Sequence, residues 1–177
     1  MRPRALAALP TAADGDRLEP SALSSACVAA EAALDAERDD QLAVDRALEV
    51  LHRLLGADLL VSVYTVELGR LWLVAQRGYD QVRDGFTLDQ GVMARAAREG
   101  AAQVVVESSS DPDFIAATDR LRSEIALPLG SGTPASGVFN VETRTALLDD
   151  AHLAPLRGLA NAITGRLDHA LEPVGLG

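Results

Sequence analysis

The sequence of 177 residues has a single cysteine, only 3% aromatic residues and no lysine. One cysteine, Cys27, cannot form an internal disulfide, and it excludes a cysteine-rich metal site. Because aromatic residues are scarce while hydrophobic residues make up 48% of the chain, we expect a core built from Ala, Val, Leu and Ile. All sixteen basic residues are arginine, which together with the many alanines indicates a GC-rich bacterial genome.

Long apolar runs are also missing. No segment approaches the ~20 apolar residues that a membrane-spanning helix needs. The apolar stretch near the N-terminus is interrupted by Pro10 and Asp14, so a secretory signal is not expected. The net charge of −10 argues against nucleic acid, whose phosphates require clustered positive charge. We therefore expect a soluble cytoplasmic protein with no membrane or nucleic-acid partner.

The sequence divides into four parts around one domain. Residues 1–19 mix Arg, Ala, Pro, Gly and Asp without periodicity, which is typical of a flexible tail. Residues 20–38 are rich in alanine and predict a helical extension, with Cys27 as a small buried side chain on its apolar stripe. The main domain spans 39–172, and residues 173–177 form a C-terminal tail.

Within the main domain the hydrophobic period changes from helical to extended and back. The predicted elements are, in order, a helix (41–55), a β-hairpin (59–66 and 71–75), an extended piece (86–88), a helix (91–100), a short strand (103–106), a loop (107–122), two strands (124–129 and 137–142) and a helix from Asp149 and Asp150 onward. The first and last of these helices carry apolar stripes at three- and four-residue spacing. We therefore predict a homodimer that forms through Leu42–Leu55 and Leu153–Leu171.

The stretch from Phe86 to Thr143 contains a characteristic series of motifs. A glycine-led helix start at Gly91 comes first, and a Ser123–Glu124 pair then enters an apolar strand that stops at Pro128. A turn of small residues and a Gly-Val-Phe-Asn-Val-Glu strand follow. This order resembles that of GAF domains. The resemblance implies an α+β fold with a GAF/PAS-like central antiparallel sheet of five to six strands, helices on both faces, and N- and C-terminal helices packed together.

The spacing from Gly91 to Ile125 is similar to that of the free methionine-(R)-sulfoxide reductases, which are GAF-fold enzymes. Where that family carries cysteines, this sequence has Met93 and Ala117. The reaction needs a thiolate and a resolving thiol, which neither residue supplies, so reductase activity is not expected. The pocket cysteine of bilin-binding GAF domains, the pocket histidine of haem-binding ones and the cyclic-nucleotide signature are also missing. The resemblance therefore implies no cofactor and no metal.

The resemblance also implies a small-molecule pocket on the sheet face beneath the loop and the glycine-led helix. We expect its lining to come from Trp72, Tyr79, Phe86, Val92, Arg95, Glu107, Asp111, Phe114, Ser123, Glu124 and Phe139. Arg95 is a candidate partner for a ligand carboxylate, whereas Glu107 and Asp111 are candidates for a cationic group. Each has an ordinary structural alternative: exposure for Arg95, turn capping for Asp111, core packing for Trp72 and Phe139, and loop anchoring for Ser123 and Glu124.

Three functions remain open. The first is a stand-alone sensory or regulatory module that binds an unidentified small molecule and signals through dimerisation or a partner protein. The absence of a visible nucleophile–base pair favours it, and no output module is expected because only six residues follow Leu171. The second is a cofactor-free enzyme with Glu107, Asp111 or Glu124 as acid or base. The third is an interaction scaffold whose pocket is filled by its own side chains.

Overall fold

The computed structural model describes residues 17–81, 85–116, 118 and 120–171, so most of both predicted tails lies outside the described residues. Its centre is a six-stranded antiparallel sheet with the strand order β3-β2-β1-β6-β5-β4. The strands are β1 (Leu59–Glu67), β2 (Arg70–Arg77), β3 (Gly85–Thr87), β4 (Gln103–Val105), β5 (Ser123–Leu129) and β6 (Gly137–Thr143). The predicted α+β fold with a central antiparallel sheet is confirmed.

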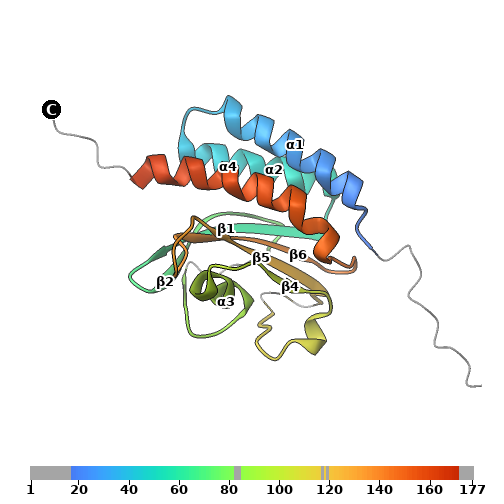
Figure 1. Ribbon diagram of the computed structural model, residues 1–177. Coiled ribbons are helices and arrows are strands. Elements are labelled where there is room, and N and C mark those ends of the chain that lie inside the picture. Colours follow the sequence, from blue (N-terminus) through green and yellow to red (C-terminus); the bar gives the residue numbers. More distant parts are fainter. Residues whose placement is uncertain (1–16, 82–84, 117, 119, 172–177) are drawn as a thin grey trace, which may run out of the picture.

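Helices cover both faces of this sheet, but unequally (Figure 1). The helices are α1 (Pro20–Ala36), α2 (Asp40–Leu55), α3 (Val92–Glu99) and α4 (Leu153–Leu171), with short 3₁₀ turns at η2 (Ser108–Ser110) and η3 (Asp150–His152). Helices α1, α2 and α4 lie together on one face, whereas α3 and the loop that follows β4 lie on the other. Among the helices of the described residues, none is long and apolar enough to cross a bilayer.

The boundaries of α2 show how the local sequence sets these elements. Asp39 caps its N-terminus, because the Asp39 carboxylate accepts a hydrogen bond from the Leu42 backbone N–H at 2.8 Å. Gly56 ends the helix with a φ of 86°, a backbone conformation that glycine adopts without strain. The helix therefore begins and ends where the sequence predicts.

Alternation along the central strands separates an apolar face from a mixed one. Val61 and Val63 of β1 belong to the large core under α1, α2 and α4. Their neighbours Ser62 and Tyr64 point to the α3 side, where Tyr64 joins a second, smaller apolar cluster that includes Val138. The buried polar side chains of Ser62, Glu124 and Glu142 are therefore directed towards α3.

The large core also uses the apolar stripes of the helices. Leu48 and Leu51 of α2, and Leu156 and Ile163 of α4, are completely buried within the chain. Helix α1 packs against both α2 and α4, so these stripes contact the sheet and α1. The packing of the N- and C-terminal helices is confirmed, while the homodimer that the stripes led us to expect stays a prediction.

We predict that Gly137→Ala destabilises the protein by about 2–3 kcal/mol, the typical cost of overpacking a core. A β-carbon at position 137 would collide with the Tyr64 carbonyl oxygen and would lie 3.2 Å from Leu129 Cδ1, in the middle of the sheet. The matched control is Gly165→Ala on α4, where the new β-carbon meets nothing within 4 Å and alanine favours the helix by about 1 kcal/mol. Urea denaturation of the two variants should shift the midpoint in opposite directions, and a neutral Gly137→Ala would contradict this packing.

Candidate ligand-binding site

A pocket of about 540 Å³ opens on the α3 side of the sheet. Its walls come from β1, β2 and β3, from the start of α3, from the loop before β5, and from β5 and β6. The lining residues are Ser62, Tyr64, Arg70, Leu71, Tyr79, Gln81, Gly85, Phe86, Thr87, Gln90, Gly91, Val92, Met93, Ile115, Ala116, Glu124 and Glu142. This volume is within the range that small-molecule sites occupy.

Two carboxyl groups lie side by side on the floor of the pocket. Glu124 of β5 is the direct cross-strand partner of Glu142 of β6, and the two residues are only 4% and 3% exposed. The Tyr79 hydroxyl donates a hydrogen bond to Glu142 Oε2. Ser62, 1% exposed, lies next to Tyr79 and hydrogen bonds with its hydroxyl. The floor therefore holds an acidic pair in a setting almost free of solvent.

Among the described residues, no cation is in direct contact with this pair. Neither Glu124 nor Glu142 forms an ion pair within the described part of the chain, although Arg95 and Arg144 act on them at longer range. Burial, reinforced by the charge of Glu142, raises the pKa of Glu124 well above its usual value. Burial raises the pKa of Glu142 to about 7, against the opposing effect of the Tyr79 hydrogen bond. At neutral pH the pair therefore retains a proton.

Asn140 lies beside Glu124 on the same side of the sheet, but its side chain does not line the cavity. It follows Phe139 and precedes Val141, both in the large core, so alternation turns its side chain to the α3 side. A hydrogen bond from Asn140 favours the ionised form of Glu124. Its Oδ1 atom is buried and has no hydrogen-bond partner among the described residues. Buried acceptors are almost always satisfied, so this oxygen next to the acidic pair is an exception among the described residues.

The other walls of the pocket are mixed, because Arg70, Gln81, Thr87 and Gln90 line it together with apolar side chains. Leu71, Phe86 and Val92 face the cavity, and the Phe86 ring meets Tyr64 edge-on at a centroid distance of 5.7 Å. Gly91 begins α3 with a φ of 97°, and a β-carbon there would lie 3.6 Å from Ile115 Cδ1. Ile115 thus lies over the start of α3. The pocket joins an acidic floor to walls that are apolar in part.

Four of the predicted lining residues, Tyr79, Phe86, Val92 and Glu124, line this pocket. Trp72 does not: it is 41% exposed, and its indole N–H points to the Glu67 carbonyl oxygen at 3.4 Å. Phe139 is completely buried in the large core, on the helical side of the sheet. Alternation explains both positions, since Leu71 and Asn140, not Trp72 and Phe139, turn to the α3 side.

Three more of the predicted pocket residues form ion pairs within the protein. Arg95 and Asp111 form an ion pair at 2.7 Å, and Glu107 accepts a hydrogen bond from Arg122 Nε at 3.1 Å. None of these side chains lines the pocket. Of the three acids named for an acid–base enzyme, only Glu124 therefore lies in the cavity.

The last two predicted residues stabilise the structure around the pocket. Ser123 donates a hydrogen bond to the Val106 carbonyl oxygen and accepts one from the Leu148 N–H at 3.2 Å. Phe114 is half-buried. It packs against the smaller apolar cluster that includes Tyr64 and Val138, and against a third cluster formed by Leu60, Tyr79 and Leu121. Met93, one of the two residues at the cysteine positions of the reductases, lines the pocket, whereas Ala117 lies outside the described residues.

Sequence reasoning did not select Glu142, Asn140 or Ser62 as site residues. A usable signal was present, because Asn140 and Glu142 alternate with Phe139 and Val141 in one strand. Polar residues at every second position of an otherwise apolar central strand indicate one shared face. No group of three or more potential metal ligands occurs among the described residues.

The sheet order, with helices on both faces and the pocket under α3, defines the GAF fold, and solved structures agree with this assignment. The free methionine-R-sulfoxide reductase of Neisseria meningitidis, solved with its substrate, has a TM-score of 0.75 and 24% identity, covering 89% of this chain and 93% of that one. A putative GAF sensor protein from Burkholderia vietnamiensis has a TM-score of 0.73 and 20% identity, covering 84% and 96%.

A third similar structure is the GAF domain of a phosphoenolpyruvate-protein phosphotransferase from Coxiella burnetii, with a TM-score of 0.73, 12% identity and coverage of 86% and 96%. No protein-family model matches the sequence, and no curated protein matches it significantly. At these identities the likeness establishes the fold. The resemblance of the sequence to GAF domains, including the GAF-fold reductases, is therefore confirmed at the level of the fold.

We predict that Glu142 makes the free energy of unfolding decrease as the pH rises. Its pKa is about 7 in the folded protein, against an ordinary value of 4.5. Between these values the folded protein holds a proton that the unfolded chain has lost, so raising the pH favours unfolding, by on the order of 3 kcal/mol for one such group. Glu142→Gln should remove this contribution and raise the stability at pH 8.

Urea denaturation at pH 5 and pH 8 measures this effect as the difference between wild type and variant. Glu49→Gln, at a half-exposed side chain on α2, is the control and should leave the pH dependence unchanged. Equal pH dependence in wild type and Glu142→Gln would show that Glu142 titrates normally.

Proposed function

We propose that this GAF domain is a sensory or regulatory module that binds a small organic cation, with the positive group held by Glu124 and Glu142. The observation that carries the proposal is the buried acidic pair, which no cation contacts in the part of the chain that the structure describes. Burying two neighbouring carboxyl groups is costly unless a positive charge accompanies them. A cationic ligand would supply that charge.

The acceptor groups of the pocket require several hydrogen-bond donors, which limits the cationic group of the ligand to a primary ammonium or a guanidinium. The two neighbouring carboxyl groups that line the pocket offer several acceptor oxygens. A primary ammonium carries three N–H donors and a guanidinium five, so either can satisfy several acceptors at once. The apolar walls formed by Leu71, Phe86 and Val92 suit a hydrocarbon substituent on that cation.

The thiol content of the pocket supports binding over reduction. Free methionine sulfoxide is itself a primary amine, and the similar reductase from Neisseria meningitidis acts on it. In this chain Met93 lines the pocket, and the cysteine, Cys27, lies in α1 on the other side of the sheet. Burial raises the pKa of the Cys27 thiol to about 12, so it is not a thiolate at neutral pH. An amino acid of this kind would be bound without reduction.

A homodimer or a partner protein would transmit the signal. Because the main apolar stripes of α2 and α4 are buried inside the chain, a dimer would use the outer surface of the helical layer, where Val28 of α1 and Leu54 of α2 are 65% and 54% exposed. We predict a dimer in light scattering at high micromolar concentration. A Val28→Asp, Leu54→Asp double variant should be monomeric, and a monomeric wild type would rule out the dimer.

Two probe molecules that differ in charge test whether the pocket requires a cationic ligand. We expect n-butylammonium to bind and 1-butanol, which has a similar shape and no charge, to bind far more weakly. Glu124→Gln and Glu142→Gln should each weaken n-butylammonium by at least about tenfold, since removing one buried charge partner costs a few kcal/mol. Binding should also weaken as the pH falls below 7, because Glu142 then becomes protonated and the pair loses its remaining negative charge.

Isothermal titration calorimetry and amide chemical shifts measure this binding. Glu49→Gln on α2 is the matched control and should bind as the wild type does. Equal affinity for butanol and butylammonium, or unchanged affinity in both pocket variants, would disprove cation recognition at this site.

A further inference from the structure

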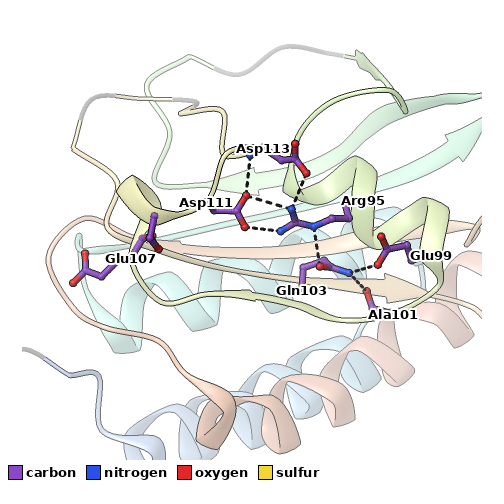
Figure 2. Close-up of polar contacts among 8 residues, drawn as sticks. Arg95, Glu99, Ala101, Gln103, Glu107, Asp111 and Asp113 are labelled. Atoms are coloured by element: carbon purple, nitrogen blue, oxygen red, sulfur yellow. Dashed lines mark hydrogen bonds and ion pairs between the residues drawn. The ribbon is translucent and has the colours of Figure 1, made fainter.

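The side chain of Arg95 connects three segments of the α3 side (Figure 2). From α3, its Nε donates to Gln103 Oε1 on β4 at 2.9 Å. Its two Nη atoms donate to both carboxylate oxygens of Asp111, at 2.7 and 3.3 Å, and Nη1 also reaches Asp113 Oδ2 at 2.8 Å. Gln103 in turn donates to Glu99 Oε2 at 2.9 Å, so its own side chain is fixed.

This arrangement is stronger than an ordinary surface ion pair. The side chains of Arg95 and Asp111 are only 19% and 16% exposed, so solvent screens them less. The contact is bidentate, which orients both planar groups. The hydrogen bond from Arg95 holds the pKa of Asp111 below its usual value, so the pair remains charged at neutral pH.

The loop segment held by Arg95 leads directly into the pocket wall. Asp111 Oδ1 accepts a hydrogen bond from the Asp113 N–H at 2.9 Å, and the Asp111 carbonyl accepts one from the Phe114 N–H at 3.2 Å. Phe114 then packs into the smaller apolar clusters, and the next two residues, Ile115 and Ala116, line the cavity. The position of this wall therefore depends on where Asp111 is held.

The base of the same loop has a separate attachment. Glu107 pairs with Arg122, and the Ser108 N–H donates to the Arg122 carbonyl oxygen at 2.7 Å. These contacts lie next to β5 and tie down the two ends of the loop. In Figure 2, Glu107 lies away from the group around Arg95. Removing Arg95 would release the wall segment while the base stays attached.

We propose that Arg95 is a positioning residue that clamps residues 111–116 against α3 and thereby sets the size of the apolar part of the pocket. The proposal deepens the proposed function, because it assigns the control of ligand shape to a residue outside the cavity. Charge recognition belongs to Glu124 and Glu142, whereas the shape of the hydrocarbon substituent is selected by the wall at Ile115 and Ala116.

The first test needs no ligand. In Arg95→Gln, hydrogen–deuterium exchange of the Asp113 and Phe114 amides should accelerate about tenfold or more, since a charge-assisted bond contributes about 1.5–3 kcal/mol. Exchange in the centre of β1 should not change, which separates local release from global unfolding. Arg46→Gln is the matched control, because it removes an exposed Arg46–Glu49 pair on α2. Unchanged exchange at Asp113 and Phe114 in Arg95→Gln would overturn the proposal.

Asp111→Asn is a second variant that breaks the same contact from the loop side. It should reproduce the exchange pattern of Arg95→Gln, and it decides the question if Arg95→Gln does not fold. Asp111→Asn with protection equal to that of wild type would also overturn the clamp.

The second test measures how strongly the pocket discriminates between ligands of different shape. In Arg95→Gln, the affinity for cyclohexylmethylammonium relative to n-butylammonium should rise by about tenfold over the wild-type ratio. The fit of a hydrocarbon group to a pocket changes binding constants by factors of this size. Discrimination between n-butylammonium and 1-butanol should stay as in wild type. An unchanged ratio despite faster exchange would refute control of pocket size. If no alkylammonium binds the wild type, the cation proposal fails, and exchange alone decides whether Arg95 holds the wall.

Discussion

Two glutamates that face each other across neighbouring central strands are the constraint around which the α3 side is organised. Glu124 and Glu142 are buried on the face that the three large helices do not cover. On the other face the same strands contribute Ile125, Leu127, Phe139 and Val141 to the apolar core. Because side chains alternate along a strand, a continuous apolar face beneath α1, α2 and α4 leaves the opposite face free to carry polar residues. The large apolar core and the proposed ligand site thus lie on opposite sides of one sheet.

The two ends of the pocket differ in how firmly they are held. The acidic floor belongs to β5 and β6, in the middle of the sheet, where each strand has a partner on both sides. The wall at Ile115 and Ala116 belongs to a loop, and Arg95 fixes it from outside the cavity. A rigid scaffold that presents adjustable loop residues is a common arrangement of binding sites. In the proposed function, this arrangement would keep the recognised charge constant while the accepted ligand shape varies.

Most of the fold could be predicted from the sequence, because the helical stripes, the hairpin and the Ser-Glu strand entry are local patterns. The site was predictable only in part. Alternation in β6 would have indicated Glu142 in place of Phe139, since the two lie on opposite faces. The pairing of Arg95 with Asp111 could not be predicted from the sequence, because it joins positions 16 residues apart across a segment without periodicity. Arg95 and Asp111 therefore looked like ligand-binding groups, although the structure pairs them with each other.

The most direct test of this account is carbon-13 NMR of the glutamate side-chain carboxyl groups as a function of pH, with Glu124→Gln and Glu142→Gln used to assign the two signals. The account predicts that in the free protein at least one of the two carboxyl groups remains protonated at pH 6. Saturating n-butylammonium should convert it to the carboxylate at the same pH. If both carboxyl groups ionise near pH 4.5 in the free protein and do not respond to n-butylammonium, the acidic pair is not a site that awaits a cation.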